Sequence, residues 1–184
     1  IWQAARATTA APSYFKPQKL GDGSSANYYV DAALGVNNPA EYLLKEAATV
    51  FGTGRRLGCL VSIGTGGRNI SLRLADRGLF KNWVEVGPHM KNMIKVLKNK
   101  TTDPEIPHQA LLNRLGAHPG SYYRFNLPGG AEEAELHEYQ KMSYLKNLTQ
   151  QYLGHAEVMR DIRRVAEGLV LDQFTHNLTV GLAG

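Results

Sequence analysis

An uninterrupted apolar run at residues 57–63, LGCLVSI, is the feature that most restricts the fold. A strand with one solvated face alternates apolar and polar residues, whereas a strand of a parallel sheet, covered on both faces, is apolar throughout. The glycine-rich turn GTGG at 64–67 follows directly and ends the run. The run therefore predicts an α/β domain with a mostly parallel sheet that is flanked by helices.

A second strand and a helix are predicted between residues 28 and 51. The triplet YYV at 28–30 is aromatic and β-branched, which is typical of strands. The helix has good starting residues, with Asn38 as its cap, Pro39 in its first position and Glu41 as a capping-box acid. Apolar residues then recur at helical spacing, and glycines at 52 and 54 end the helix.

Asp31 stands between this strand and this helix, and it is the first candidate for chemistry. In open α/β sheets, ligands and reacting groups collect at the carboxyl ends of strands. Small residues and Gly35 follow Asp31 and suit a tight turn. A solvated aspartate in an ordinary turn has the same spacing, and spacing alone favours that interpretation.

The remaining chain continues the alternation of helices and strands. A helix ends before Pro12, residues 20–26 read as a surface loop, and a strand is expected at 121–127. Residues 171–184 read as a loosely packed tail, so we assign 1–170 to the domain. Further helices are predicted from apolar periodicity at 79–100, 104–115, 136–153 and around 159–169.

The predicted helix at 79–100 carries basic residues beside its apolar side: Lys91, Lys95, Lys98 and Lys100. Such a helix is compatible with transient contact with an anionic membrane surface. A surface helix with its apolar stripe in the core is the interpretation we favour. The formal net charge of +5 is too mild to require nucleic acid, and we expect none to bind.

Composition and motifs exclude several kinds of site. The six histidines form no H-E-x-x-H pattern, and Cys59 is the one cysteine, so we expect no metal and no cofactor. The turn at 64–67 is neither a P-loop nor a G-x-G-x-x-G, which disfavours a nucleotide site. No serine stands in a G-x-S-x-G elbow. The low cysteine content favours an intracellular protein.

Four stretches resemble the patatin-like phospholipase family. They are ARATTAAPSYF at 5–15, DAALGVNNP at 31–39, VSIGTG at 61–66 and YRFN at 123–126, and they occur in the family's order. The resemblance implies an α/β fold in which a Ser–Asp dyad cleaves acyl esters of lipids. It assigns Asp31 as the catalytic base, a lipid ester as the substrate, and no residues for substrate binding.

The resemblance also implies that this chain lacks essential parts. The family's nucleophile and its oxyanion loop lie upstream of the stretch that resembles 5–15, and Ile1 already stands in a helix-like segment. We therefore expect a C-terminal portion, incomplete at its N-terminus and inactive without the missing segment. Ala32 replaces a family glycine and could crowd the turn. The alternative is a degenerate, non-catalytic lipid-binding or interaction domain, which the upstream sequence would distinguish.

Overall fold

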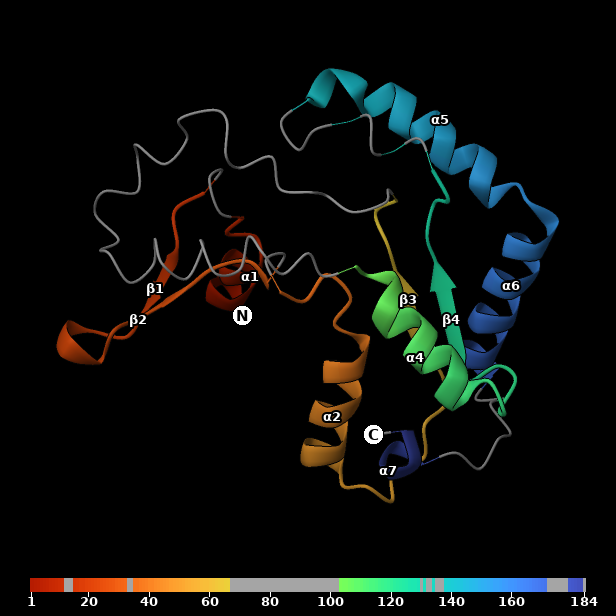
Figure 1. Cartoon of the computed structure of the whole chain (residues 1–184), viewed down its shortest axis with the longest axis horizontal. Coiled ribbons are helices and arrows are strands. Elements are labelled where there is room, and N and C mark those ends of the chain that lie inside the picture. The colour runs from red at the N-terminus through yellow and green to blue at the C-terminus, as the bar shows by residue number, and fades with distance from the viewer. Residues whose placement is uncertain are drawn as a thin grey trace. The chain divides into compact units, whose positions relative to one another are not determined.

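The computed structural model describes residues 1–11, 15–32, 35–66, 103–129, 131, 134, 138–171 and 179–183. The lysine-bearing helix predicted at 79–100 lies outside these residues. The chain divides into two compact units, and along the described chain the boundary falls between Asn37 and Asn38. Each unit is described by itself below (Figure 1).

Among its described residues, the first unit contains one α-helix and one strand pair. Helix α1 (Trp2–Thr8) confirms the helix predicted before Pro12. Strand β1 (Gln18–Leu20) is joined through a 3₁₀ turn, η1 (Gly23–Ser25), to strand β2 (Asn27–Tyr29). The two strands are antiparallel, with Lys19 opposite Tyr28. The strand predicted before Asp31 is thus confirmed, but it pairs in a hairpin and not in the parallel sheet.

The second unit carries the parallel strands that the sequence predicts. Strands β3 (Leu60–Ile63) and β4 (Tyr122–Phe125) are parallel, and Ser62 lies opposite Arg124. The helices of this unit are α2 (Ala40–Phe51), α4 (Glu105–Leu115), α5 (Met142–Leu153), preceded by the 3₁₀ turn η5 (Tyr139–Lys141), α6 (Ala156–Leu171) and α7 (Val180–Ala183). The protein is therefore of the α/β class.

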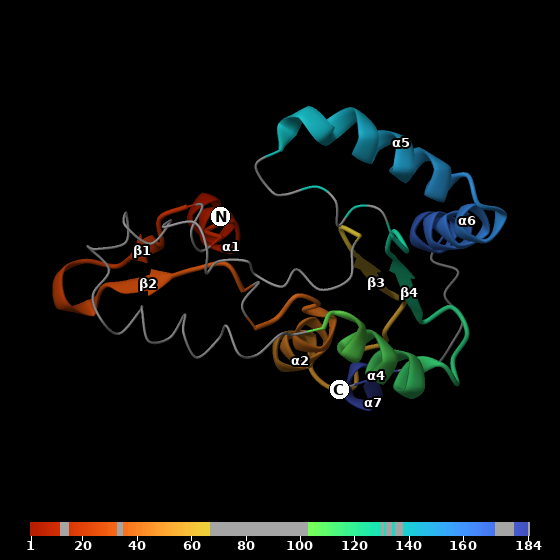
Figure 2. The same ribbon diagram turned by 45° about the horizontal axis from the view of Figure 1, so that its top comes forward.

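A small apolar core joins α2 and α4 to strand β3. Its members, all nearly inaccessible to solvent, are Ala40, Leu44, Leu60, Leu111 and Leu115. Helices α2 and α4 lie together beside the strand pair, whereas α5 and α6 lie above it and to its right in Figure 2. The run at 57–63 is buried on this face only, because Ile63 is 79% exposed among the described residues. The prediction of a strand covered on both faces therefore holds for one face.

The C-terminal segment at 179–183 is packed, which contradicts the expected loose tail. The N–H of Val180 donates to the carbonyl of Arg55, and the N–H of Gly181 donates to that of Thr53, both at 2.8 Å. Val180 is only 3% exposed. These bonds join residues far apart in the sequence, so periodicity could not reveal the docking; the boundary at residue 170 itself stays a prediction.

Candidate functional site

Asp31 lies where the sequence places it, in the loop between β2 and α2. Its side chain is half-buried, and its backbone N–H donates to the carbonyl of Ala10 at 3.0 Å. The turn after it closes on Ala32, whose carbonyl accepts the N–H groups of Gly35 at 2.8 Å and Val36 at 2.7 Å. The loop thus begins with a backbone tie to the end of the α1 region and a tight turn.

Asn38, at the other end of this loop, is 3% exposed, and both Oδ1 and Nδ2 of its amide are hydrogen-bonded. Its Oδ1 accepts the N–H of Ala40 at 3.3 Å and the hydroxyl of Ser62 at 3.2 Å. Its Nδ2 donates to the carbonyl of Pro104 at 3.2 Å. Asn38 therefore does bind a helix N–H, as predicted, but Pro39 precedes the helix instead of occupying its first position.

The start of α4 repeats the pattern, since Asp103 precedes Pro104 and Glu105 as Asn38 precedes Pro39 and Ala40. Asp103 Oδ1 accepts the N–H of Glu105 at 2.9 Å. A proline has no N–H to satisfy, so an Asn or Asp before it can reach the first free N–H of the helix. Glu41, predicted as a capping-box acid, has no N–H to accept at the N-cap Pro39, and its Oε1 lies 4.0 Å from Nη1 of Arg114.

Arg124 connects these helix starts to the strand pair. Its Nη1 donates to Ser62 Oγ at 2.9 Å, and its Nη2 donates to Glu105 Oε1 at 3.1 Å. The Arg124 side chain is 6% exposed and that of Glu105 is 47% exposed. A buried guanidinium is costly unless a carboxylate and hydrogen bonds offset its desolvation. Among the described residues, Nε of Arg124 has no hydrogen-bond partner.

The glycine-rich turn after β3 is shaped by Asn126. The N–H of Gly66 donates to Asn126 Oδ1 at 2.9 Å, and Asn126 Nδ2 donates to Glu105 Oε1 at 3.5 Å. A Cβ at position 64 would collide with the Asn126 side chain, and Gly66 has a φ of +80° that side-chain-bearing residues avoid. The two glycines therefore leave room for the Asn126 side chain where strand β3 ends and the loop begins.

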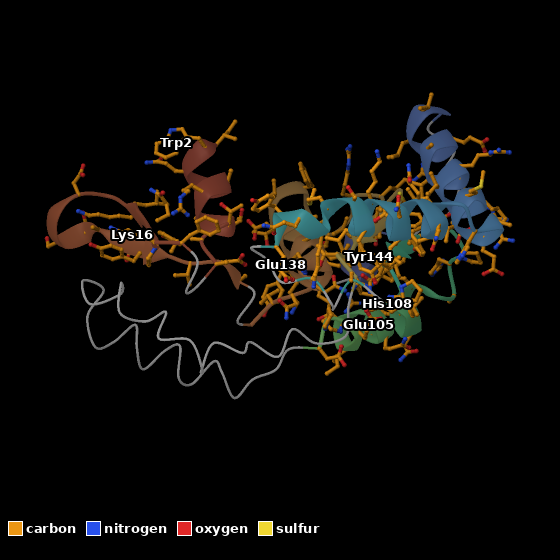
Figure 3. The ribbon with its side chains drawn as sticks, turned by 90° about the horizontal axis from the view of Figure 1, so that it is seen from above. Trp2, Lys16, Glu105, His108, Glu138 and Tyr144 are labelled. Atoms are coloured by element: carbon orange, nitrogen blue, oxygen red, sulfur yellow. The ribbon has the colours of Figure 1, made fainter. Side chains whose placement is uncertain are left out.

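His108 and Tyr122 belong to the same polar cluster, since the side chain of Tyr122 is also hydrogen-bonded to those of Asn38 and Ser62. His108 Nδ1 lies 3.0 Å from the hydroxyl of Tyr122, and Glu105 and His108 lie near one another on α4 (Figure 3). Burial lowers the pKa of His108, against the opposing effect of Glu105. Burial also raises the pKa of Tyr122. Both groups are thus neutral near pH 7, which suits a structural histidine.

The sequence did not indicate that these side chains come together as a group. Ser62 and Arg124 are polar residues within largely apolar or aromatic strands, and that was the available signal. Their contact depends on the register of two strands far apart in sequence, which no spacing reveals. Within the described ranges, no three His, Cys, Asp or Glu side chains gather as metal ligands. No described helix is long and apolar enough to cross a membrane.

Several known proteins are similar to this chain. Patatin-like phospholipase 1 of Plasmodium falciparum is 30% identical over 186 residues, which is 92% of this chain and 26% of that protein. Calcium-independent phospholipase A2-gamma of Homo sapiens is 32% identical over 126 residues, covering 68% of this chain and 14% of its own length. Phospholipase A I of Arabidopsis thaliana is 31% identical over 148 residues, which is 79% of this chain and 10% of that protein.

The chain thus spans about a quarter or less of the relatives it matches. No family model matches it, and neither does any solved structure. The likeness to several phospholipases nevertheless covers much of the chain, and the α/β fold agrees with it. The chain belongs to the patatin-like phospholipase family, a family of lipid hydrolases.

Proposed function

We propose that this chain is the C-terminal portion of a patatin-like lipid acyl hydrolase and that Asp31 is the general base of its Ser–Asp dyad. The observation that carries the proposal is the place of Asp31, which opens the stretch DAALGVNNP in the loop between β2 and α2. Relatives named as phospholipases match much of the chain and support a phospholipid ester as the substrate; an acylglycerol ester is the alternative substrate of the proposal.

The chemistry requires a carboxylate next to a serine hydroxyl that another segment supplies. Asp31 accepts the hydroxyl proton while the serine oxygen attacks the acyl carbon. The tetrahedral oxyanion collapses, the alcohol leaves with the proton held by Asp31, and an acyl-enzyme remains. Water then attacks that ester, Asp31 again takes a proton and returns it to the serine, and the fatty acid is released. Oxyanion donors outside this chain stabilise both tetrahedral states.

Ala32 is the feature that would favour a degenerate, non-catalytic domain. Its side chain is exposed, and its carbonyl accepts the two N–H groups that close the turn after Asp31. The turn therefore forms with alanine in this position, and the alanine side chain is exposed. This geometry favours the hydrolase over the degenerate alternative.

The 184-residue chain alone is expected to be catalytically silent. The two serines in or next to the parallel strands are buried and already hydrogen-bonded: Ser62 is 8% exposed and donates to Asn38, and Ser121 is fully buried and donates to the carbonyl of Leu115. Acyl transfer needs nucleophile, base and oxyanion donors together.

The test is to incubate the purified chain with a fluorophosphonate probe and with phospholipid vesicles. We expect no labelled serine and no fatty acid release, whereas a longer protein that includes the G-x-S-x-G segment should show both. Stoichiometric labelling of one serine within these residues, with turnover lost when that serine becomes alanine, would contradict the proposal.

A further inference from the structure

We propose that Asn38, Ser62 and Arg124 form a positioning relay for the Asp31 loop. The relay would affect hydrolysis by fixing the position of Asn38, where this loop joins the second unit. The proposal rests on the proposed function of Asp31. None of its members touches substrate in this proposal, so they are positioning residues. Arg124 is held in turn by Glu105.

The relay is a continuous chain of buried hydrogen bonds within the second unit. Arg124 Nη1 donates to Ser62 Oγ at 2.9 Å, and the Ser62 hydroxyl donates onward to Asn38 Oδ1 at 3.2 Å. Asn38 and Ser62 are 3% and 8% exposed. Both lone pairs of Asn38 Oδ1 are used, since Ala40 N–H also donates to it. The orientation of the Asn38 amide is therefore set from three sides, Pro104 being the third.

The connection to Asp31 is covalent and short. Residues 32–37 are all that separates Asp31 from Asn38, and the turn that starts at Ala32 uses up part of that length. A general base must lie about 2.6–3.2 Å from the hydroxyl that it deprotonates. A misplacement of about 1 Å can lower the rate of an enzyme by roughly 100-fold. Because these six residues are the whole connection, an anchor at Asn38 limits how far the Asp31 carboxylate can lie from it.

Packing alone does not explain the polarity of the relay. A buried ion pair can often be replaced by apolar residues of similar volume without loss of stability. Here, arginine and serine instead occupy facing positions near the carboxyl ends of two parallel strands, beside the apolar core. In α/β folds this edge of the sheet is where functional groups are placed. Fixed geometry at Asn38 is what these polar side chains provide.

The test compares Ser62→Ala with Ser121→Ala in a longer protein that contains the nucleophile segment. Both serines are buried in the second unit, and each change removes one hydroxyl donor: that of Ser62 to Asn38, and that of Ser121 to the Leu115 carbonyl. We expect Ser62→Ala to lower Tm at least as much as Ser121→Ala, because it also leaves Nη1 of the buried Arg124 without its acceptor. Ser62→Ala alone should lower kcat, by about 10-fold or more, with little change in KM. Ser62→Thr, which keeps the hydroxyl, should recover most of the kcat.

Equal kcat values for the two alanine variants, or no recovery by Ser62→Thr, would overturn the relay. The same preparation of the longer protein distinguishes this from failure of the proposed function. If Asp31→Asn is inactive while Ser62→Ala behaves as Ser121→Ala does, only the relay is wrong. If Asp31→Asn keeps its turnover, the assignment of the base is wrong and the relay falls with it.

Discussion

Replacing Asp31 with asparagine, in a longer protein that contains the nucleophile segment, is expected to lower kcat for ester hydrolysis by about 1000-fold or more. Asparagine has the shape of aspartate but cannot accept the serine proton, and a general base contributes roughly 10²–10⁴ in rate. The fold should persist, because the tie between Asp31 and Ala10 uses the backbone N–H, which the substitution keeps. Turnover of a soluble p-nitrophenyl ester and a thermal melt measure the two effects separately.

Asp22→Asn is the matched control for this variant. Asp22 lies in the exposed turn between β1 and β2, in the same unit as Asp31. Its replacement by asparagine removes the same negative charge. Its kcat and Tm should both stay close to those of the unmodified protein. Near-normal turnover by Asp31→Asn would rule out Asp31 as the base, whatever the control shows.

Leu111→Ala should have the largest effect on stability. Leu111 is fully buried on α4, at the centre of the core formed with α2 and β3. Truncating a buried leucine removes apolar contacts and leaves a cavity, which costs about 2–5 kcal/mol of unfolding free energy. The same helix begins at Glu105 and follows Pro104, so its packing also supports the groups around Arg124 and Asn38.

Leu112→Ala on the same helix is the control, since its side chain is 39% exposed. The identical change should cost about 1 kcal/mol or less there. Denaturant unfolding of the 184-residue chain, followed by circular dichroism, gives both values. A Leu111→Ala midpoint equal to that of Leu112→Ala would show that the core does not lie where the structure places it.

The elements that the sequence predicted well are those with a local signal. Continuous apolarity identified β3, helical spacing identified α2 and α4, and the Asn38–Pro39 pair marked the start of α2. Strand β1 was missed because Gln18–Leu20 is too short and polar for any periodicity. Because β1 was not predicted, its antiparallel pairing with β2 was not predicted either.

The candidate site was predictable only in part. Position alone left Asp31 indistinguishable from an ordinary turn residue, and family resemblance was needed to single it out. The contacts of Arg124 could not be predicted, because they join residues from separate elements through strand register and helix packing. The docking of 179–183 onto Thr53 and Arg55 is likewise a long-range backbone contact without a sequence signature.

The most direct test locates the nucleophile and measures its dependence on Asp31 in one experiment. The longer protein, with and without Asp31→Asn, is treated with a fluorophosphonate, and the labelled peptide is identified by mass spectrometry. We expect one labelled serine, outside the 184 residues of this chain, with a labelling rate that falls sharply in Asp31→Asn. A label on a serine within these residues, or an equal labelling rate in both proteins, would contradict this expectation.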